Sequence, residues 1–353
     1  MARAHTDAHG GGPAGRGATV ARGVAAWTSA AWRADAVAWL DQRLAAAGVA
    51  RVGEVEQPHV RPWATVLRAP TTAGTVWFKA AGSGTAFEVA LYGLLAEIVP
   101  QRVLTPIATD VARAWVVLPD GGPSLGERLT GDALADALVA ALVRYGELQR
   151  EVAPHVDDLL ALGVADMRPA VMVERLEAAL EMTGRYDTSA RARAVLPRVA
   201  AMRPVVASWC ARLAASQVPA SLDHNDLHPW NVLGAAGDAR FYDWGDSVVA
   251  HPFAAMLVPL GFVARELRAT PDDPRVQRAR DTYLAGFGGV APGEDLADTL
   301  EVACRVAKIA RALTWHRALR AARAQDEAID ATWTSAPLET LASLLDAGYV
   351  GGA

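Results

Sequence analysis

The sequence predicts an α+β fold with two lobes, a small antiparallel sheet lobe followed by a larger and mainly helical one. Short strand-like runs separated by turns occupy residues 51–118, whereas helical patterns dominate from residue 125 onward. Between them, the run PDGGP at residues 119–123 breaks both patterns and is typical of a linker. With 353 residues, 52% of them hydrophobic, the chain can form a buried core in each lobe.

Three parts follow from this pattern. Residues 1–22, whose first part is rich in Gly, Ala and His without periodicity, are expected to form a disordered N-terminal tail. Residues 23–120 are expected to form the N-lobe and residues 121–353 the C-lobe. In the N-lobe we expect five strands, at residues 51–56, 64–68, 75–80, 104–109 and 114–118, and helices at 30–47 and 85–99, the second being the key helix beside the sheet. In the C-lobe we expect helices at about 125–130, 133–152, 167–183 and 189–216 and several after residue 252, interrupted by strands and loops at 221–247.

Composition argues against several classes of protein. The net charge of −5 disfavours a nucleic-acid partner, which would require a basic face. Residues 1–20 contain no apolar signal sequence, and the most apolar long stretch, residues 248–264, contains Pro252 and Pro259 and is expected to be buried rather than membrane-spanning. Cys210 and Cys304 lie far apart and outside any CxxC pair, which favours free thiols in the cytoplasm. No protein partner is indicated.

The chemistry is concentrated in the run HNDLHPWNVL at residues 224–233 and the run FYDWGD at 241–246. Residues 232–233 and 240–242 are expected to pair as a hairpin, which places Asn231 roughly opposite Asp243. A carboxylate and an amide oxygen directed at one point suit Mg²⁺. Asp226 precedes Asn231 on the same loop, within reach of a hydroxyl that attacks a metal-bound phosphate. These are the parts that phosphoryl transfer from a nucleotide requires.

In their order and spacing the two runs resemble the catalytic loop and metal-binding segment of the aminoglycoside phosphotransferase and choline kinase superfamily, a group distantly similar to protein kinases. The resemblance implies a protein-kinase-like fold, ATP and Mg²⁺ as cofactors, Asp226 as the catalytic base, and Asn231 and Asp243 as Mg²⁺ ligands. It also implies a small-molecule hydroxyl acceptor, such as an amino sugar, an aminoglycoside or a choline-like amine. Asn225 stands where a protein kinase has the arginine of its H-R-D motif, and no A-P-E motif follows Asp243, so a small-molecule kinase is favoured over a protein kinase.

Lysine is rare in this chain, since the 34 basic residues include only Lys79 and Lys308. Lys79 ends a strand-like apolar run, where we expect it to bind the α- and β-phosphates of ATP. Glu88, on the next helix, is the expected partner of Lys79, although Thr85 and Glu88 also match the pattern of a capping box.

Two further segments are expected to contact the nucleotide. Leu118 and Asp120, in the linker region, are expected to bind the adenine base through their backbone, an expectation based on position alone. Residues 57–62 occupy the place of the phosphate-covering loop but contain no glycine, so contact there would use side chains such as His59 or Arg61.

Several alternatives stay open at this point. The missing glycines also fit a nucleotide-binding but catalytically silent regulatory protein, and the histidines 224 and 228 around Asp226 fit a metal-dependent hydrolase. Asp246 is expected to support the site rather than to bind metal. The acidic and aromatic run of residues 326–333 fits either a solvated helix face or a wall of a pocket for a cationic substrate.

Overall fold

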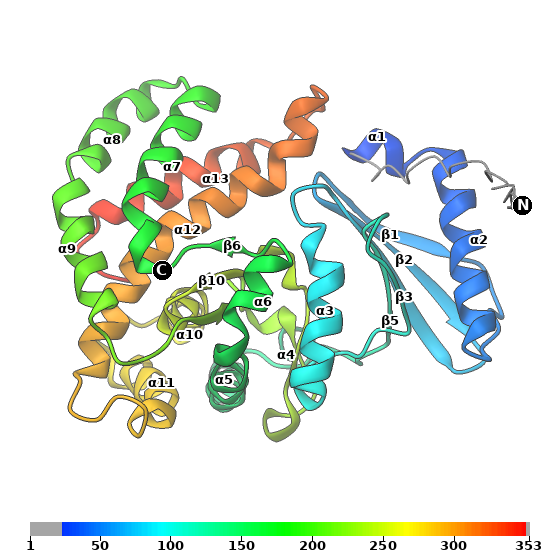
Figure 1. Cartoon of the computed structure of the whole chain (residues 1–353), viewed down its shortest axis with the longest axis horizontal. Helices are drawn as coiled ribbons and strands as arrows, with labels where there is room; N and C mark the ends of the chain where they lie inside the picture. The colour runs from blue at the N-terminus through cyan, green and yellow to red at the C-terminus, as the bar shows by residue number, and fades with distance from the viewer. Residues whose placement is uncertain (1–22, 351–353) are drawn as a thin grey trace, which may run out of the picture.

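A computed structural model describes residues 23–350 and shows two lobes joined by the segment after residue 119 (Figure 1). The predicted tail at residues 1–22 lies outside the described residues. The N-lobe contains a five-stranded antiparallel sheet in the order β1-β2-β3-β5-β4. Its elements are α1 (Gly23–Trp27), α2 (Ala30–Ala46), β1 (Glu56–Arg61), β2 (Ala64–Thr71), β3 (Gly74–Ala81), α3 (Phe87–Ile98), β4 (Ala108–Asp110) and β5 (Trp115–Pro119).

Helices α2 and α3 cover opposite faces of the sheet. On the outer face, Trp39 of α2 packs edge-on against Phe78 of β3 and Trp115 of β5, with ring centroids 5.8 and 5.5 Å apart. On the inner face, α3 buries Leu91 and Leu95 in the cluster that continues into the C-lobe. The sheet is therefore held rigidly between two apolar layers, which fixes the position of the side chains at its edge.

The first strand lies elsewhere than the sequence indicates. The predicted strand at residues 51–56 forms only an isolated bridge from Arg51 to Thr71, and β1 instead begins at Glu56 and runs through the segment expected to be the phosphate-covering loop. The expected loop is therefore an edge strand, whose side chains are mostly exposed and lack the apolar alternation that marks a buried strand. Pro58 is accommodated where the register shifts between Glu56 and His59. Arg61 pairs with Ala64, which leaves only a two-residue turn at residues 62–63.

The C-lobe is mainly helical and contains two small sheets within the described residues. Strands β6 (Ala165–Asp166), β10 (Val248–Ala250) and β7 (Ser221–Asp223) form one small sheet, and β8 (Val232–Leu233) pairs with β9 (Arg240–Phe241), as the sequence predicted. The helices are α4 (Leu125–Arg128), α5 (Gly131–Val152), α6 (Val156–Ala161), α7 (Met172–Tyr186), α8 (Ala190–Ala200), α9 (Arg203–Ala214), α10 (Leu257–Glu266), α11 (Pro274–Leu284), α12 (Leu296–Ala324) and α13 (Ala331–Ala342). The single helix predicted over residues 189–216 is two helices, because a turn follows Ala200 and Pro204 begins a new helix.

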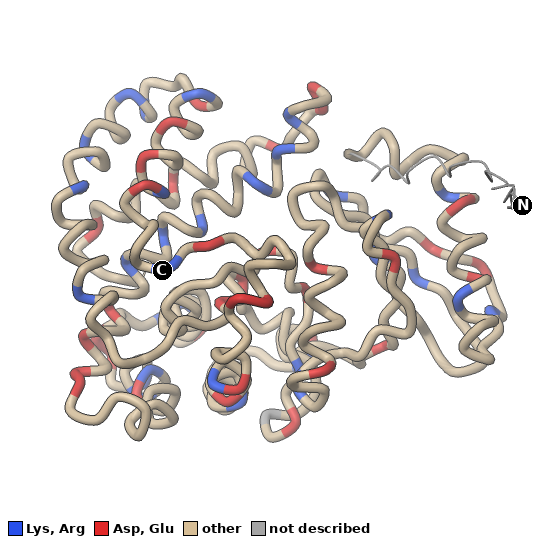
Figure 2. The backbone as a smooth tube through the Cα atoms, viewed as in Figure 1, with Lys and Arg blue, Asp and Glu red and all other residues tan. Residues whose placement is uncertain are grey.

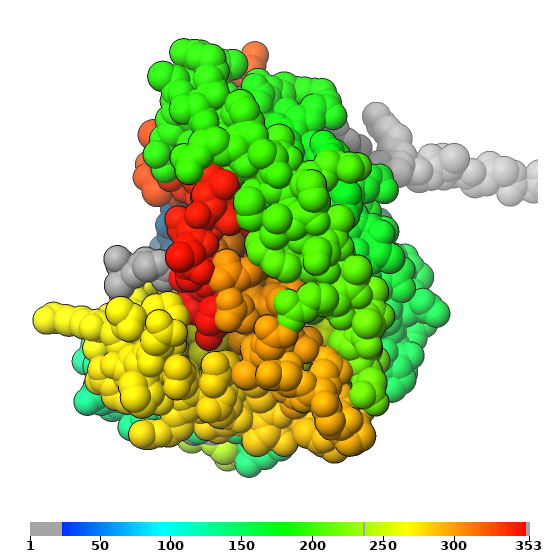
Figure 3. Space-filling view, turned by 90° about the vertical axis from the view of Figure 1, so that its left-hand side faces the viewer, coloured from blue at the N-terminus to red at the C-terminus, as the bar shows by residue number. Residues whose placement is uncertain are grey.

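The longest helix, α12, organises the C-lobe. It packs against α7, α9 and α13, and its Lys308 is buried. The Lys308 ammonium donates to the carbonyls of Ser343 and Gly348, at 2.8 and 3.3 Å. The C-terminal segment, red in Figure 3, lies between the green helices α8–α9 and the yellow and orange part of the lobe. Lys308 thus fastens this segment to the core.

The surface carries mixed charge. Lys and Arg alternate with Asp and Glu along the elements of both lobes rather than gathering on one face (Figure 2). Among the helices of residues 23–350, none has the length and apolar run needed to cross a membrane.

A buried histidine of α12 makes the stability of the C-lobe depend on pH. His316 Nδ1 lies 2.8 Å from a guanidinium nitrogen of Arg323, which can only donate, so the ring proton sits on Nε2 and is donated to Thr183 Oγ1 at 2.9 Å. Burial, and after it the charge of Arg323, lower the pKa of His316 to about 4. In the unfolded chain the same group titrates near 6.5, so as the pH falls from about 6.5 to 4 the unfolded chain takes up the proton first.

We therefore expect His316 to lower the free energy of unfolding by up to about 1.4 kcal/mol for each pH unit as the pH falls through that window. In urea unfolding at pH 7 and pH 5, the wild type should lose more stability than His316→Gln, which cannot titrate. His155→Gln, at an exposed histidine, is the control and should follow the wild type. Parallel pH profiles for the wild type and His316→Gln would contradict this assignment.

Candidate active site

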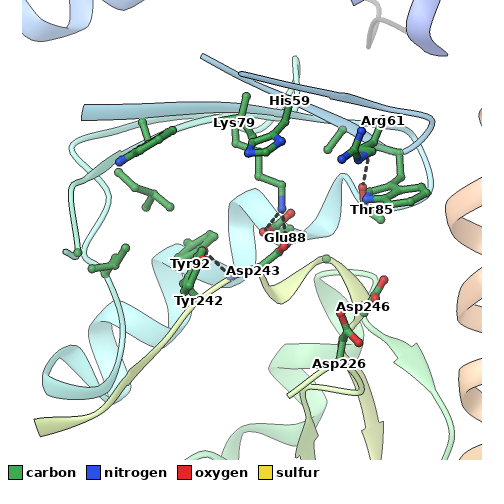
Figure 4. Close-up of a pocket in the computed structure, with 18 of the residues that line it drawn as sticks. His59, Arg61, Lys79, Thr85, Glu88, Tyr92, Asp226, Tyr242, Asp243 and Asp246 are labelled. Carbon is green, nitrogen blue, oxygen red and sulfur yellow. Dashed lines mark hydrogen bonds and ion pairs between the residues drawn. The ribbon is translucent and has the colours of Figure 1, made fainter. Parts of the chain in front are cut away.

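A cavity of about 800 Å³ lies between the lobes (Figure 4). Its walls come from β1–β3 and α3 on the N-lobe side, the segment after β5, and the loops around β7–β9 together with α12 on the C-lobe side. Six of the seven site residues expected from the sequence line it: Lys79, Glu88, Leu118, Asp120, Asp226 and Asp243. The seventh, Asn231, is buried behind the wall, with 4% of its surface exposed.

Lys79 bridges the two lobes. It points from β3 toward Glu88 on α3 and toward Asp243 from the C-lobe. Its ammonium lies 2.8 Å from Glu88 Oε1 and 2.6 Å from Asp243 Oδ1. Burial opposes the charged ammonium, but Asp243 and Glu88 more than offset it and hold the pKa of Lys79 above its usual value. The competing capping-box interpretation is wrong, because α3 begins after Ala86 without a side-chain cap and the Thr85 hydroxyl donates to the Trp63 carbonyl instead.

The two carboxylates around Lys79 have different environments. Burial raises the pKa of Glu88 to about 7, against the opposing effect of Lys79. The pKa of Asp243 is lowered, since the pull of Lys79 exceeds the effect of burial. Asp243 also has left-handed backbone angles, φ 64° and ψ 62°, and its N–H donates to the Tyr92 hydroxyl at 3.0 Å. Its carboxylate is thereby held ionised and turned into the cavity.

The donor set beside Asp243 suits a hard cation. The Asn231 carbonyl accepts from Tyr242 N–H at 3.3 Å, so Asn231 lies opposite the neighbour of Asp243, one residue from the predicted register. Its side-chain N–H₂ donates to the Asp226 carbonyl at 3.0 Å, which leaves an oxygen as the other end of its amide. Within residues 23–350 no group of three or more His, Cys, Asp and Glu side chains could hold a metal ion. Two protein oxygens supplemented by phosphate oxygens and water are the arrangement that Mg²⁺ takes at nucleotide sites, so the residues fit that ion.

The loop after β7 presents Asp226. His224 donates from Nε2 to the Tyr242 carbonyl at 2.9 Å, and its backbone N–H donates to the Tyr145 hydroxyl at 2.8 Å. His224 is fully buried and is a loop-fixing residue rather than a metal ligand. His228 Nε2 lies 3.3 Å from Asp226 Oδ2. The loop is therefore fixed on both sides of Asp226, with its carboxylate left facing the cavity.

The part of the cavity next to the linker is apolar. Leu118 is paired with Trp77 across β5 and β3, and both side chains line the cavity. The Asp120 N–H already donates to the Thr75 carbonyl, and the Asp120 carboxylate accepts from Gly122 N–H. The backbone carbonyl of Asp120 is therefore the group of this residue that remains free to accept a hydrogen bond from a nucleotide base. The apolar lining here is Ala64, Val66, Trp77, Leu104, Leu118 and Leu233.

The turn that covers the cavity differs from a glycine-rich loop. Its Trp63 carbonyl accepts from Gly82 N–H at 2.7 Å, and a Cβ at position 82 would lie 2.9 Å from that oxygen, so only glycine fits there. The turn is thus fastened to the connection between β3 and α3. Instead of backbone amides, it brings the side chains of His59 and Arg61 to the cavity.

The sequence profile of the phosphotransferase enzyme family matches residues 78–292, more than half of the chain. The chain belongs to this phosphotransferase family. The match includes Lys79, Asp226, Asn231 and Asp243, and it confirms the enzyme class expected from the sequence. No curated protein matches the sequence.

Solved structures of other phosphotransferases share the fold. A macrolide 2′-phosphotransferase from Brachybacterium faecium is 19% identical, with a TM-score of 0.53 over 89% of this chain and 98% of that one. A choline kinase from Streptococcus pneumoniae is 15% identical, with a TM-score of 0.53 over 87% and 99%. An aminoglycoside 2′-phosphotransferase solved as a GDP complex is 14% identical, with a TM-score of 0.54 over 87% and 97%. The expected protein-kinase-like fold is confirmed.

One residue of this phosphotransferase that sequence analysis missed is Arg311, on α12. One guanidinium nitrogen donates to Asp226 Oδ1 at 2.8 Å and the other donates to the Asn225 carbonyl. Burial alone would raise the pKa of Asp226, but Arg311 and His228 lower it well below its usual range. Asn225, with φ 59°, is itself held by Thr314 Oγ1, one turn from Arg311. The guanidinium that pairs with Asp226 thus comes from a distant helix. No pattern within residues 224–233 indicated this partner.

Removing this guanidinium should affect turnover more than nucleotide binding. In Arg311→Met we expect kcat to fall by about 10–100-fold, because Asp226 loses the fork that orients it, with little change in nucleotide KM. Arg311→Lys keeps the charge without the fork and should restore only part of the loss. Arg305→Met, on the same helix but paired with Glu301 away from the cavity, is the matched control for steady-state kinetics. An unchanged kcat in Arg311→Met would remove Arg311 from this role.

Proposed function

We propose that this phosphotransferase moves the γ-phosphoryl group of ATP to a hydroxyl of a small molecule, with Mg²⁺ as cofactor. The observation that carries the proposal is the shared cavity. The Lys79–Asp243 ion pair and the Asp226 carboxylate line one cavity of about 800 Å³, which has an apolar part next to the linker. We place the reaction in the cytoplasm, where the buried free thiols of Cys210 and Cys304 would stay reduced.

The N-lobe residues serve nucleotide binding in this proposal. Lys79 binds the α- and β-phosphates, and Glu88 keeps its ammonium in position. Leu118 contacts the base and Asp120 offers it a backbone carbonyl. Asn231 and Asp243 would hold Mg²⁺, which neutralises charge on the phosphoryl oxygens when bound. Asp243 also contacts Lys79, so its carboxylate would be shared between the ammonium and the ion.

Asp226 acts on the acceptor. Its carboxylate accepts a hydrogen bond from the acceptor hydroxyl and directs the oxygen lone pair at the γ-phosphorus. It takes the hydroxyl proton as the new P–O bond forms, while the bond from the γ-phosphorus to the β,γ-bridging oxygen breaks and ADP leaves. Arg311 keeps the carboxylate ionised and correctly rotated. Because a strongly stabilised carboxylate is a weak base, orientation contributes more than basicity here.

Two substitutions test the proposal together. Asp226→Asn should keep Mg²⁺-dependent nucleotide binding but lower turnover by about 10²–10⁴-fold, the usual contribution of a positioned acid or base. Asp243→Asn should lose the Mg²⁺ dependence itself, because the carboxylate ligand is removed. Thermal stabilisation by ATP, with and without Mg²⁺, and slow ATP hydrolysis are the two measurements.

A catalytically silent nucleotide-binding protein is the second candidate, favoured by the turn at residues 62–63, which lacks glycine. Stabilisation by ATP without any hydrolysis in the wild type would support it and would contradict phosphoryl transfer. Wild-type turnover in Asp226→Asn would contradict the role of Asp226 alone.

Lys79 tests whether charge or shape matters at the nucleotide. A compact ammonium can touch a phosphate and a carboxylate in the narrow space beside Glu88, whereas a planar guanidinium needs a different approach. Lys79→Arg should therefore reduce ATP turnover nearly as much as Lys79→Ala. Arg68→Lys, an exposed exchange on the neighbouring strand β2, is the control. Lys308, though it is the chain's other lysine, is unsuitable because it is buried. Full activity in Lys79→Arg would show that charge alone suffices.

A further inference from the structure

We infer that the acceptor is a hydroxyl compound with a flat apolar face and no more than one positive charge, rather than a polycationic amino sugar. The inference rests on the proposed function and concerns the end of the cavity next to Asp226. Two features of that end support it: the side chains that line it, and the ion pairs that its charged groups already form.

Part of the cavity wall lies beside Asp226 and is called here the aromatic corner. It consists of Trp63, Thr314, Trp315 and Ala318. The last three lie on one face of α12 with Arg311, at the i, i+3, i+4 and i+7 spacing of a helix. Arg311 and Thr314 bond to Asp226 and Asn225, so the corner begins within one helical turn of the catalytic loop. Trp63 reaches it from the N-lobe turn and meets Trp315 edge to face, with ring centroids 6.2 Å apart. Both indoles are only half-buried. They offer a surface suited to a sugar face or an aromatic ring.

Carboxylates of the cavity offer little to a polycation. Glu88 and Asp243 are paired with Lys79, and Asp226 is paired with Arg311. Near the linker, the Asp120 carboxylate accepts from Gly122 N–H, and the Glu127 carboxylate accepts from the Ser124 N–H and hydroxyl. α12 contributes no carboxylate to the lining.

Asp246 is the remaining carboxylate beside Asp226, because Asp120 and Glu127 lie near the linker, at the end proposed for the nucleotide. Asp246 therefore sets the limit of one charge at the acceptor end. It faces the same space as Asp226 (Figure 4). Burial and the charge of Asp226 raise the pKa of Asp246 to about 6, against the opposing charges of Arg317 and Arg311. One ammonium group could bind there, but the several ammonium groups of an aminoglycoside would find no further partners and would lose their hydration.

The acidic and aromatic run at residues 326–333 does not line the cavity, so it supplies no cation site there. Glu327 accepts hydrogen bonds from the backbone of Val24 and Ala25 and so caps α1, and Asp330 caps α13. Trp333 packs edge-on against Trp63, with centroids 5.0 Å apart, and Arg61 lies over the Trp333 ring. This segment therefore adds one indole behind the aromatic corner, and Arg61 of β1 lies over that indole.

The test compares acceptors of different charge on the wild-type enzyme. Coupled ADP release is measured with an aryl glucoside, with a macrolide that carries one amine, and with kanamycin as the polycation. Binding of each compound to the ADP-loaded enzyme is measured by calorimetry, so that a compound that binds without turnover still counts. We expect at least one of the first two to exceed kanamycin by tenfold or more in kcat/KM or in affinity. Preference for kanamycin, or no binding of the first two, overturns the inference.

Variants of the corner separate stacking from general effects. Trp315→Ala should weaken binding of the preferred acceptor by about tenfold, seen as a rise in acceptor KM, and Trp315→Phe should weaken it much less. Trp209→Ala, at a half-buried indole of α9 that does not line the cavity, is the matched control and should leave the acceptor KM unchanged. An unchanged acceptor KM in Trp315→Ala would also overturn the inference. If the wild type showed no Mg²⁺-dependent ATP turnover at all, the proposed function would be contradicted instead. A failure of the inference can therefore be distinguished from a failure of the proposed function.

Discussion

The Lys79 ammonium ties together three segments that are far apart in the sequence: strand β3, helix α3 and the C-lobe segment at Asp243. Such an ion pair costs desolvation energy for every group it buries, and Glu88, whose pKa rises to about 7, bears much of that cost. The arrangement persists because the sheet and α3 are each fixed by apolar packing, so the charged groups cannot move apart to regain water. Rigid layers on both faces of the sheet are therefore a requirement of the site as well as a source of stability.

Helix α12 is the counterpart of that interaction in the C-lobe. One of its faces holds the loop of Asp226 through Arg311 and Thr314 and meets the N-lobe turn through Trp315. Its other faces pack against α7, α9 and α13. A shift of this helix would change the orientation of Asp226, the proposed base, and the opening of the cavity at the same time. The loop of Asp226 and the proposed acceptor wall are thus positioned by one rigid element, which favours a fixed geometry for the proposed transfer.

The features that could be predicted from the sequence are those encoded by local pattern. The hairpin at residues 232–241, helix α2 and the pairing of Lys79 with Glu88 all follow from spacing within a short segment. Strand β1 could not be predicted because an edge strand exposes most of its side chains and so lacks the alternation that marks a buried strand. Arg311 could not be predicted because its contact with Asp226 spans 85 residues, and helical periodicity says which residues share a face but not what that face meets. The division of the chain at residue 120 stays a prediction.

The scarcity of lysine acquires a physical meaning once both lysines are located. Lys79 and Lys308 are each enclosed by the fold, and each donates to two oxygen groups from different segments. Many arginines are more exposed and form planar pairs such as Arg51 with Asp41, although Arg102 is as enclosed as Lys79. An ammonium directs its three donors in different directions from a compact centre, whereas a guanidinium donates within one plane. The scarcity of lysine therefore indicates positions that enclose an ammonium group, and does not by itself indicate catalysis. At position 79 an enclosed ammonium also lies in the cavity between the lobes, and this coincidence is what connects lysine usage in this chain with its chemistry.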